Sequence, residues 1–271
     1  MSKKEEIISP QRAAFLKETV YHKRFVVFMQ IFILVALVFL WELLARIGII
    51  DSFIASQPTR IIKTLAGLSK NDILIHFGVT CFETLTGFVL GVIFGMVLAA
   101  ALWWSRTFSE IMEPYLVVLN SLPKIALGPI IIIWVGAGTK AIIVMALAIS
   151  LIVTVLELLE GFNKTDSDVI KMAKTLGASR KQIFLKIVFP SNLSTLMNSL
   201  KINIGLSLVG VIAGEFLVSK AGLGYLIVYG GQVFQLDLVM ASVIILAVFA
   251  AVLYKAVVCL EKIVVKRSHF K

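Results

Sequence analysis

The chain has 271 residues, of which 59% are hydrophobic and only 15% are charged, and its mean hydropathy is +0.97. An ordinary soluble domain carries roughly 25% charged residues, so this composition argues against a soluble domain and favours a membrane protein. The formal net charge of +10 is compatible with a nucleic-acid binder, but the basic residues lie in the tails and in loops beside apolar runs. We therefore interpret the positive charge as a determinant of membrane topology.

Apolar runs of about 20 residues recur along the chain, and a helix of that length spans a bilayer. The predicted spans lie at residues 25–44, 82–104, 115–135, 141–159, 193–217 and 238–260. The runs lack the alternation of a membrane β-strand, and a segment inside lipid must satisfy its own backbone hydrogen bonds. The predicted fold class is therefore all-α, a polytopic membrane protein with six transmembrane helices. The first run is too long for a signal-peptide core, so we expect it to be retained.

The Lys and Arg residues indicate the orientation of these spans. With the N-terminus placed in the cytoplasm, 17 of the 26 basic residues fall on the inner side and 6 on the outer side. Such enrichment on the inner side is the rule for membrane proteins. We expect a cytoplasmic tail at 1–24, a transmembrane domain at 25–262 and a second cytoplasmic tail at 263–271.

The segment after the first span has two local features. Glu42 and Arg46 are four residues apart, which favours a surface ion pair over a functional site. Residues 58–65 form an amphipathic pattern with Pro58 at its start, where proline is tolerated in a helix. We predict a short helix there, on the outer side of the membrane.

Glycines recur at four-residue spacing in two spans. Gly87, Gly91 and Gly95 lie in the second span, and Gly210 and Gly214 lie in the fifth. Small residues at this spacing let helices approach closely. Packing within the chain and a seam between two copies both explain the pattern, and we favour packing within the chain.

The third span carries a charged residue between two prolines. Lys124 lies about 15 Å into the span at 1.5 Å per residue, flanked by Pro123 and Pro129, so we expect the helix to be kinked or broken there. A lysine at that depth faces a cavity or a partner. It either attracts an anionic solute or binds carbonyls freed by the prolines. Asn120, Pro123 and Lys124 are candidate residues of a translocation pathway.

A polar segment, residues 160–190, separates the fourth and fifth spans on the inner side. Apolar residues recur at helical spacing before Gly177, which we expect to end a first helix in a left-handed conformation. Ser179 and Gln182 fit a capping box that begins a second helix, and Pro190 begins the break before the fifth span. The apolar edge of these helices would meet either a partner protein or the lipid headgroups.

Glu215 lies near the outer end of the fifth span. It either lines the pathway or, as we favour, pairs with a charge at its mouth. Cys81 and Cys259 fall in or beside apolar runs, so we expect neither a disulfide nor a metal site from them. The three histidines lie at span edges or in tails, and no metal site is predicted.

The spacing of the polar segment resembles that of a known family, the membrane permeases of bacterial ABC importers. Their EAA loop has the pattern Glu-Ala-Ala, three residues, Gly, nine residues, Ile-x-Leu-Pro. Four residues here match that pattern: Ala173, Gly177, Ile187 and Pro190. Three others depart from it: Lys171, Met172 and Phe189. Residues 122–129, 134–136, 214–215 and 222–226 further resemble the nitrate/sulfonate/taurine-type permeases.

This resemblance implies a homodimer of six-helix subunits in the bacterial inner membrane, two cytoplasmic ATPase subunits and an external solute-binding protein. It implies that the polar segment couples this chain to the ATPase. The coupling residues would be Ala173, Leu176, Gly177, Ala178, Ile187 and Pro190. The chain has no GxxxxGK[ST] motif, so we expect no enzyme activity and no cofactor of its own, with ATP and Mg²⁺ bound by the partner.

Two other functional classes compete with this interpretation. A membrane-embedded enzyme would need paired carboxylates, HExxH or a Ser/His dyad within its spans, and the sequence shows none of these. An ion-coupled secondary transporter would show inverted repeats and midplane acids, whereas the deepest predicted charge here is basic. We expect an ATP-driven importer of a small solute. An organic anion such as a sulfonate, taurine or nitrate is the first candidate, and a thiamine-precursor pyrimidine is the alternative.

Overall fold

The computed structural model describes residues 10–67 and 72–268, and helices make up most of them, with no strand in either range. The predicted all-α class is confirmed. The chain divides into two compact units, Met1–Lys63 and Thr64–Lys271. Parts of the two predicted tails, residues 1–9 and 269–271, lie outside the described residues.

The first unit contains the long helix α1 (Pro10–Arg46), the short helix α2 (Ser52–Ala55) and most of α3 (Pro58–Gly67). Residues Glu18–Arg46 are long and apolar enough to span a membrane, and none of their most apolar window is buried. A helix that is apolar on all sides is solvated by lipid. α1 runs without a break through the predicted boundary between tail and span at residue 24. The predicted short helix after Pro58 is confirmed as α3.

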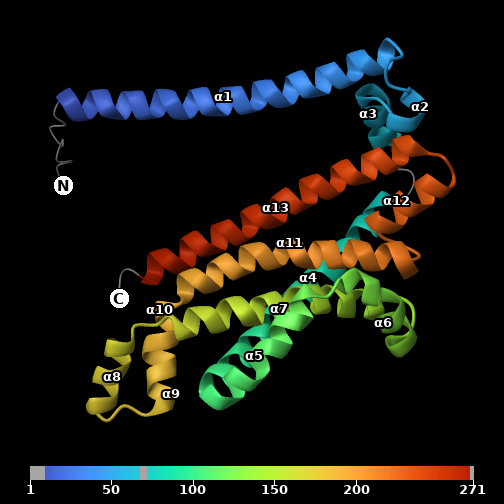
Figure 1. Cartoon of the computed structure of the whole chain (residues 1–271). Helices are drawn as coiled ribbons and strands as arrows, with labels where there is room; N and C mark the ends of the chain where they lie inside the picture. Colours follow the sequence, from blue (N-terminus) through green and yellow to red (C-terminus); the bar gives the residue numbers. More distant parts are fainter. Residues whose placement is uncertain (1–9, 68–71, 269–271) are drawn as a thin grey trace. The chain divides into compact units, whose positions relative to one another are not determined.

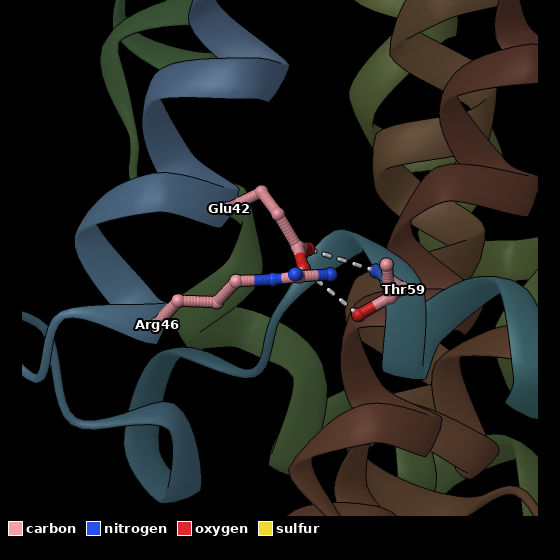
Figure 2. Close-up of polar contacts among 3 residues, drawn as sticks. All are labelled: Glu42, Arg46 and Thr59. Atoms are coloured by element: carbon pink, nitrogen blue, oxygen red, sulfur yellow. Dashed lines mark hydrogen bonds and ion pairs between the residues drawn. The ribbon is translucent and has the colours of Figure 1, made fainter.

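The end of α1 is tied to the first turn of α3 by one carboxylate (Figure 2). Glu42 Oε1 accepts hydrogen bonds from Arg46 Nε at 2.7 Å and from Thr59 Oγ1 at 3.0 Å, and Oε2 accepts from the Thr59 N–H at 3.1 Å. The predicted Glu42–Arg46 pair is confirmed. Its carboxylate also stabilises the N-terminus of α3, where backbone N–H groups lack partners within the helix.

The second unit is a bundle in which the longest helices lie alongside one another (Figure 1). It contains α4 (Ile73–Trp104), α5 (Arg106–Ser121), the 3₁₀ turn η2 (Lys124–Leu127), α6 (Gly128–Val135), α7 (Thr139–Asn163), α8 (Ser167–Thr175), α9 (Arg180–Ile183), the π-helical turn η3 (Phe184–Val188), α10 (Phe189–Ser191), α11 (Leu193–Val218), α12 (Leu223–Gln232) and α13 (Leu236–Ser268). Helices α8 and α9 lie at one end of the bundle and α12 lies at the other (Figure 1).

Five helices of the described residues are long and apolar enough to cross a membrane, and a bent pair makes a possible sixth. The predicted third span, 115–135, is this pair, Arg106–Ser121 and Lys124–Val135, bent by 88°. The predicted break beside Pro123 is confirmed, because α5 ends at Leu122 in extended backbone. Pro129 does not cause a second break, because it lies in the first turn of α6, where no N–H is needed.

Glycines on α4 and on α11 allow both helices to pack closely against α7. A Cβ atom on Gly87 would lie 2.7 Å from the Ala146 side chain, and one on Gly95 would lie 2.6 Å from Thr154. A Cβ on Gly210 would lie 2.6 Å from the backbone of Ala146. The buried hydroxyl of Thr154 donates to the Ser150 carbonyl of its own helix at 2.9 Å, so it needs no water. The glycine motifs therefore serve packing within the chain, as we favoured from the sequence.

We predict that Gly210→Ala destabilises the bundle, whereas Gly205→Ala does not. Both changes add helix propensity to α11, but only the methyl group at 210 would meet the α7 backbone, and nothing lies within 4 Å of a Cβ at 205. Overpacking of this kind costs about 1–3 kcal/mol. Melting temperatures of the two purified variants check this, and equal values would contradict the close α7–α11 contact.

Candidate functional site

The predicted helix end at Gly177 is confirmed, and its geometry explains why glycine stands there. Gly177 has a φ of +81°, in the left-handed region that glycine enters without penalty. The N–H of Ala178 donates to the Ala173 carbonyl and the N–H of Gly177 donates to the Lys174 carbonyl, both at 3.0 Å. This pair of bonds is a Schellman motif, which satisfies the last carbonyls of α8.

The second predicted helix begins directly after this turn. Ser179 Oγ accepts from the N–H of Gln182 at 3.3 Å, and Gln182 Oε1 accepts from the N–H of Ser179 at 2.8 Å. The predicted capping box is therefore confirmed. Residues 166–192, which form α8, the turn at Gly177 and the helical turns α9 to α10, are called the elbow below.

The break before α11 takes a form that the sequence did not predict. The N–H of Phe189 donates to the carbonyl of Phe184, five residues back, in the widened turn η3. Pro190 has no N–H, and its ring would clash with the carbonyl four residues back in a regular helix. Asn192 then binds the connection between α7 and α8, because its Nδ2 donates to Thr165 Oγ1 at 2.9 Å. The same Nδ2 also donates to the Val188 carbonyl of η3 at 2.8 Å.

One side of the elbow is packed into the bundle. Ala173, Ile183 and Val188 are buried in one cluster with Phe162 of α7. The Phe184 ring lies 5.1 Å from Trp103 of α4 and 5.4 Å from Phe162, measured between ring centroids. These contacts bind the elbow to the ends of both α4 and α7.

The other side of the elbow is open. Leu176 is 79% exposed and Met172 is 59% exposed. Of the other predicted coupling residues, Gly177 and Pro190 are exposed and Ala178 and Ile187 are half-buried. Lys171, which departs from the family pattern, pairs with Asp168 of its own helix at 3.0 Å.

The predicted pathway residues Asn120, Pro123 and Lys124 meet at the 88° bend. Lys124 Nζ donates to the Asn120 carbonyl at 2.7 Å and lies 3.4 Å from Asn120 Oδ1. That carbonyl stands in the last turn of α5, where carbonyls have no partner within the helix. Of the two roles left open by the sequence, this geometry favours binding of the freed carbonyl.

Glu215 lies elsewhere, on α11, and its side chain contacts the first turn of α12. Its Oε1 accepts from the Thr80 hydroxyl at 2.6 Å, and its Oε2 accepts from the Gly224 N–H at 2.5 Å. These partners are a hydroxyl and a backbone N–H, in place of the cation that we favoured from the sequence. Thr80 Oγ1 also accepts from the Leu223 N–H at 2.8 Å, and His76 Nδ1 accepts from the Gly222 N–H at 3.0 Å.

Sequence reasoning missed the role of α4 in this cluster. Successive N–H groups at the N-terminus of α12 are bound by His76, Thr80 and Glu215. Glu83 of α4 is also fully buried beside them. The available signal was the presence of two acids inside apolar spans, where ionisable residues are rare. No group of three or more His, Cys, Asp or Glu side chains that could hold a metal ion occurs within residues 10–67 and 72–268.

Relatives with known names match most of the chain. It is 29% identical to a probable ABC transporter permease protein of Haemophilus influenzae over 80% of this chain and 89% of that protein. It is 26% identical to the formylaminopyrimidine transport permease protein of Halalkalibacterium halodurans, over 70% and 75%. It is 25% identical to the taurine transport system permease protein of Escherichia coli, over 81% and 82%. The expected resemblance to taurine-type permeases is confirmed.

The fold is also that of a solved transporter. A chain of the MetNI methionine ABC transporter, in an inward-facing conformation, superposes with a TM-score of 0.59 at 18% identity, over 68% of this chain and 93% of that one. Residues 91–269 match the family model for binding-protein-dependent transport system inner membrane components, a segment that includes the elbow, Glu215 and α12. The chain belongs to that family and is a multi-pass transport component of the inner membrane.

Proposed function

We propose that this chain is moved by a separate ATPase that docks on the elbow. The elbow supports this proposal because one of its sides is packed and the other is open. Ala173 and Ile183 are buried in the bundle, whereas Leu176 and Met172 are exposed. An exposed apolar face beside a rigid attachment is suited to a protein partner. ATP and Mg²⁺ would be bound by that partner, and this chain would contribute no bond chemistry.

We also propose that the elbow lies on the cytoplasmic side, together with both termini. The bias of Lys and Arg toward that side supports this orientation. The opposite end of the bundle, with α12, would then receive the loaded solute-binding protein (Figure 1). Two ATPase subunits and a second copy of this chain would complete the importer.

The substrate is proposed from the relatives, because the chain's own residues do not identify it. An organic anion such as taurine, another sulfonate or nitrate is the first candidate, and a formylaminopyrimidine is the second. The taurine and formylaminopyrimidine relatives support these two classes with similar identity. The hydrogen bond from Lys124 to the Asn120 carbonyl gives the lysine a structural role, so its presence does not by itself indicate an anionic substrate.

We predict that Gly177→Asp abolishes ATP-driven uptake and that Gly177→Asn retains most of it. Both side chains tolerate the left-handed conformation, and nothing lies within 4 Å of a Cβ there, so both should fold. Only Asp adds a negative charge to the negative end of α8 and to the docking face. Uptake of taurine and of formylaminopyrimidine by the assembled importer in vesicles, normalised to inserted protein, measures the difference. Normal uptake by Gly177→Asp would refute docking at the elbow.

A second pair of variants tests Lys124. Lys124→Met should lower the melting temperature, since a hydrogen bond from a charged group contributes about 1.5–3 kcal/mol, whereas Lys124→Arg should lower it less. The KM for uptake should stay unchanged in both variants while the maximal rate falls in Lys124→Met. A higher KM for taurine in Lys124→Met, with an unchanged melting temperature, would instead assign the lysine to anion recognition.

A further inference from the structure

Glu83 is a buried acid without a hydrogen-bond partner. Its side chain is fully buried on α4, and neither carboxylate oxygen has a partner among the described residues. Its carboxyl group lies beside that of Glu215 on α11 and beside Thr139 of α7. A buried carboxylate that is ionised and unpaired is strongly disfavoured, so these surroundings disfavour a charge on Glu83.

Glu215 is equally buried but differs from Glu83 in its hydrogen-bond partners. It is 1% exposed, and each oxygen accepts a short hydrogen bond, Oε1 from the Thr80 hydroxyl and Oε2 from the Gly224 N–H. Donors aimed at both oxygens stabilise the ionised form of a carboxyl group. The backbone of α12 approaches closely enough that a Cβ on Gly224 would lie 2.8 Å from Oε2. The negative charge also lies at the N-terminus of α12, where the helix dipole favours it.

The geometry points to a carboxyl pair that shares one proton, in which neutral Glu83 donates its O–H to ionised Glu215. The pair carries one negative charge in place of two. Two like charges in contact inside the bundle would repel each other strongly, and one proton removes that repulsion. The same proton supplies Glu83 with the partner that it otherwise lacks.

The other groups near the pair are contributed by three helices. His76 of α4 accepts from the Gly222 N–H through Nδ1, and its ring stacks on Tyr225 of α12 with centroids 5.8 Å apart. α7 contributes the Thr139 hydroxyl. The pair therefore acts as a positioning device for α12. Ionised Glu215 binds the first turn of α12 and keeps it against α4 and α11. Neutral Glu83 donates a hydrogen bond to Glu215 and so fixes the position of its carboxylate.

Infrared spectroscopy of the purified chain tests the proton directly. We expect the C=O band of a neutral buried carboxyl in the wild-type protein at neutral pH. The band should disappear in Glu83→Gln and persist in the control Glu110→Gln, because Glu110 is exposed and paired with Arg106. A wild-type spectrum without the band, or a band unaffected by Glu83→Gln, would overturn the proposal.

Melting temperatures provide an independent test. Glu83→Gln should melt close to the wild type, because an amide N–H replaces the acid O–H as donor to Glu215. Glu215→Gln should melt several degrees lower, because its NH₂ group would face the N–H of Gly224 or the Thr80 hydroxyl. If Glu83→Gln and Glu215→Gln lowered the melting temperature equally, the assignment of Glu83 as donor and Glu215 as acceptor would be wrong. If the wild-type melting temperature rises with sodium concentration and the neutral-carboxyl band is absent, the proposal is wrong, and a bound cation compensates the charge of the pair instead of a proton.

Discussion

The close approach of α4 and α11 to α7 is the contact on which the rest of the second unit depends. It is possible because glycines on both outer helices face small residues on α7, so the backbones meet with few side chains between them. In lipid there is little hydrophobic force between helices, and close packing replaces it. The result is a three-helix core whose helices extend to both ends of the bundle.

Each end of this core carries a different attachment. At one end α7 continues into α8, and the elbow returns through Asn192 into α11, so two core helices share one connection. At the other end, α4 and α11 together bind the first turn of α12 through His76, Thr80 and Glu215. A force applied to the elbow would act on the same helices that hold α12. Such an arrangement suits a component that links a partner on one side of a membrane to a partner on the other.

The parts of the structure that the sequence predicted are those governed by local backbone rules. The turn at Gly177 follows from the left-handed conformation that glycine adopts, and the capping box at Ser179 follows from a three-residue spacing. The break near Pro123 was expected because a proline disrupts the hydrogen bonding of a helix. Its bend of 88° was not, because neighbouring helices determine the direction of a chain after a break.

The parts that the sequence did not predict depend on contacts between distant residues. Glu83 and Glu215 are separated by more than a hundred residues, and no spacing rule joins them. The binding of Thr80 to both Glu215 and Leu223 likewise appears only when α4, α11 and α12 are packed together. The sequence shows both acids as ionisable residues within apolar runs, but it does not show which residues they contact.

Site-specific crosslinking tests the docking of an ATPase on the elbow most directly. In a background with Cys81 and Cys259 replaced by Ala, a cysteine is placed at Leu176 and, as a control, at Leu74. Both positions are about equally exposed, at 79% and 80%. Leu176 is in the elbow, whereas Leu74 is in the first turn of α4, close to His76, which binds the start of α12. With the assembled importer in membranes, docking on the elbow predicts capture of the ATPase subunit from position 176 and not from position 74. No capture from 176, or equal capture from both, would contradict it.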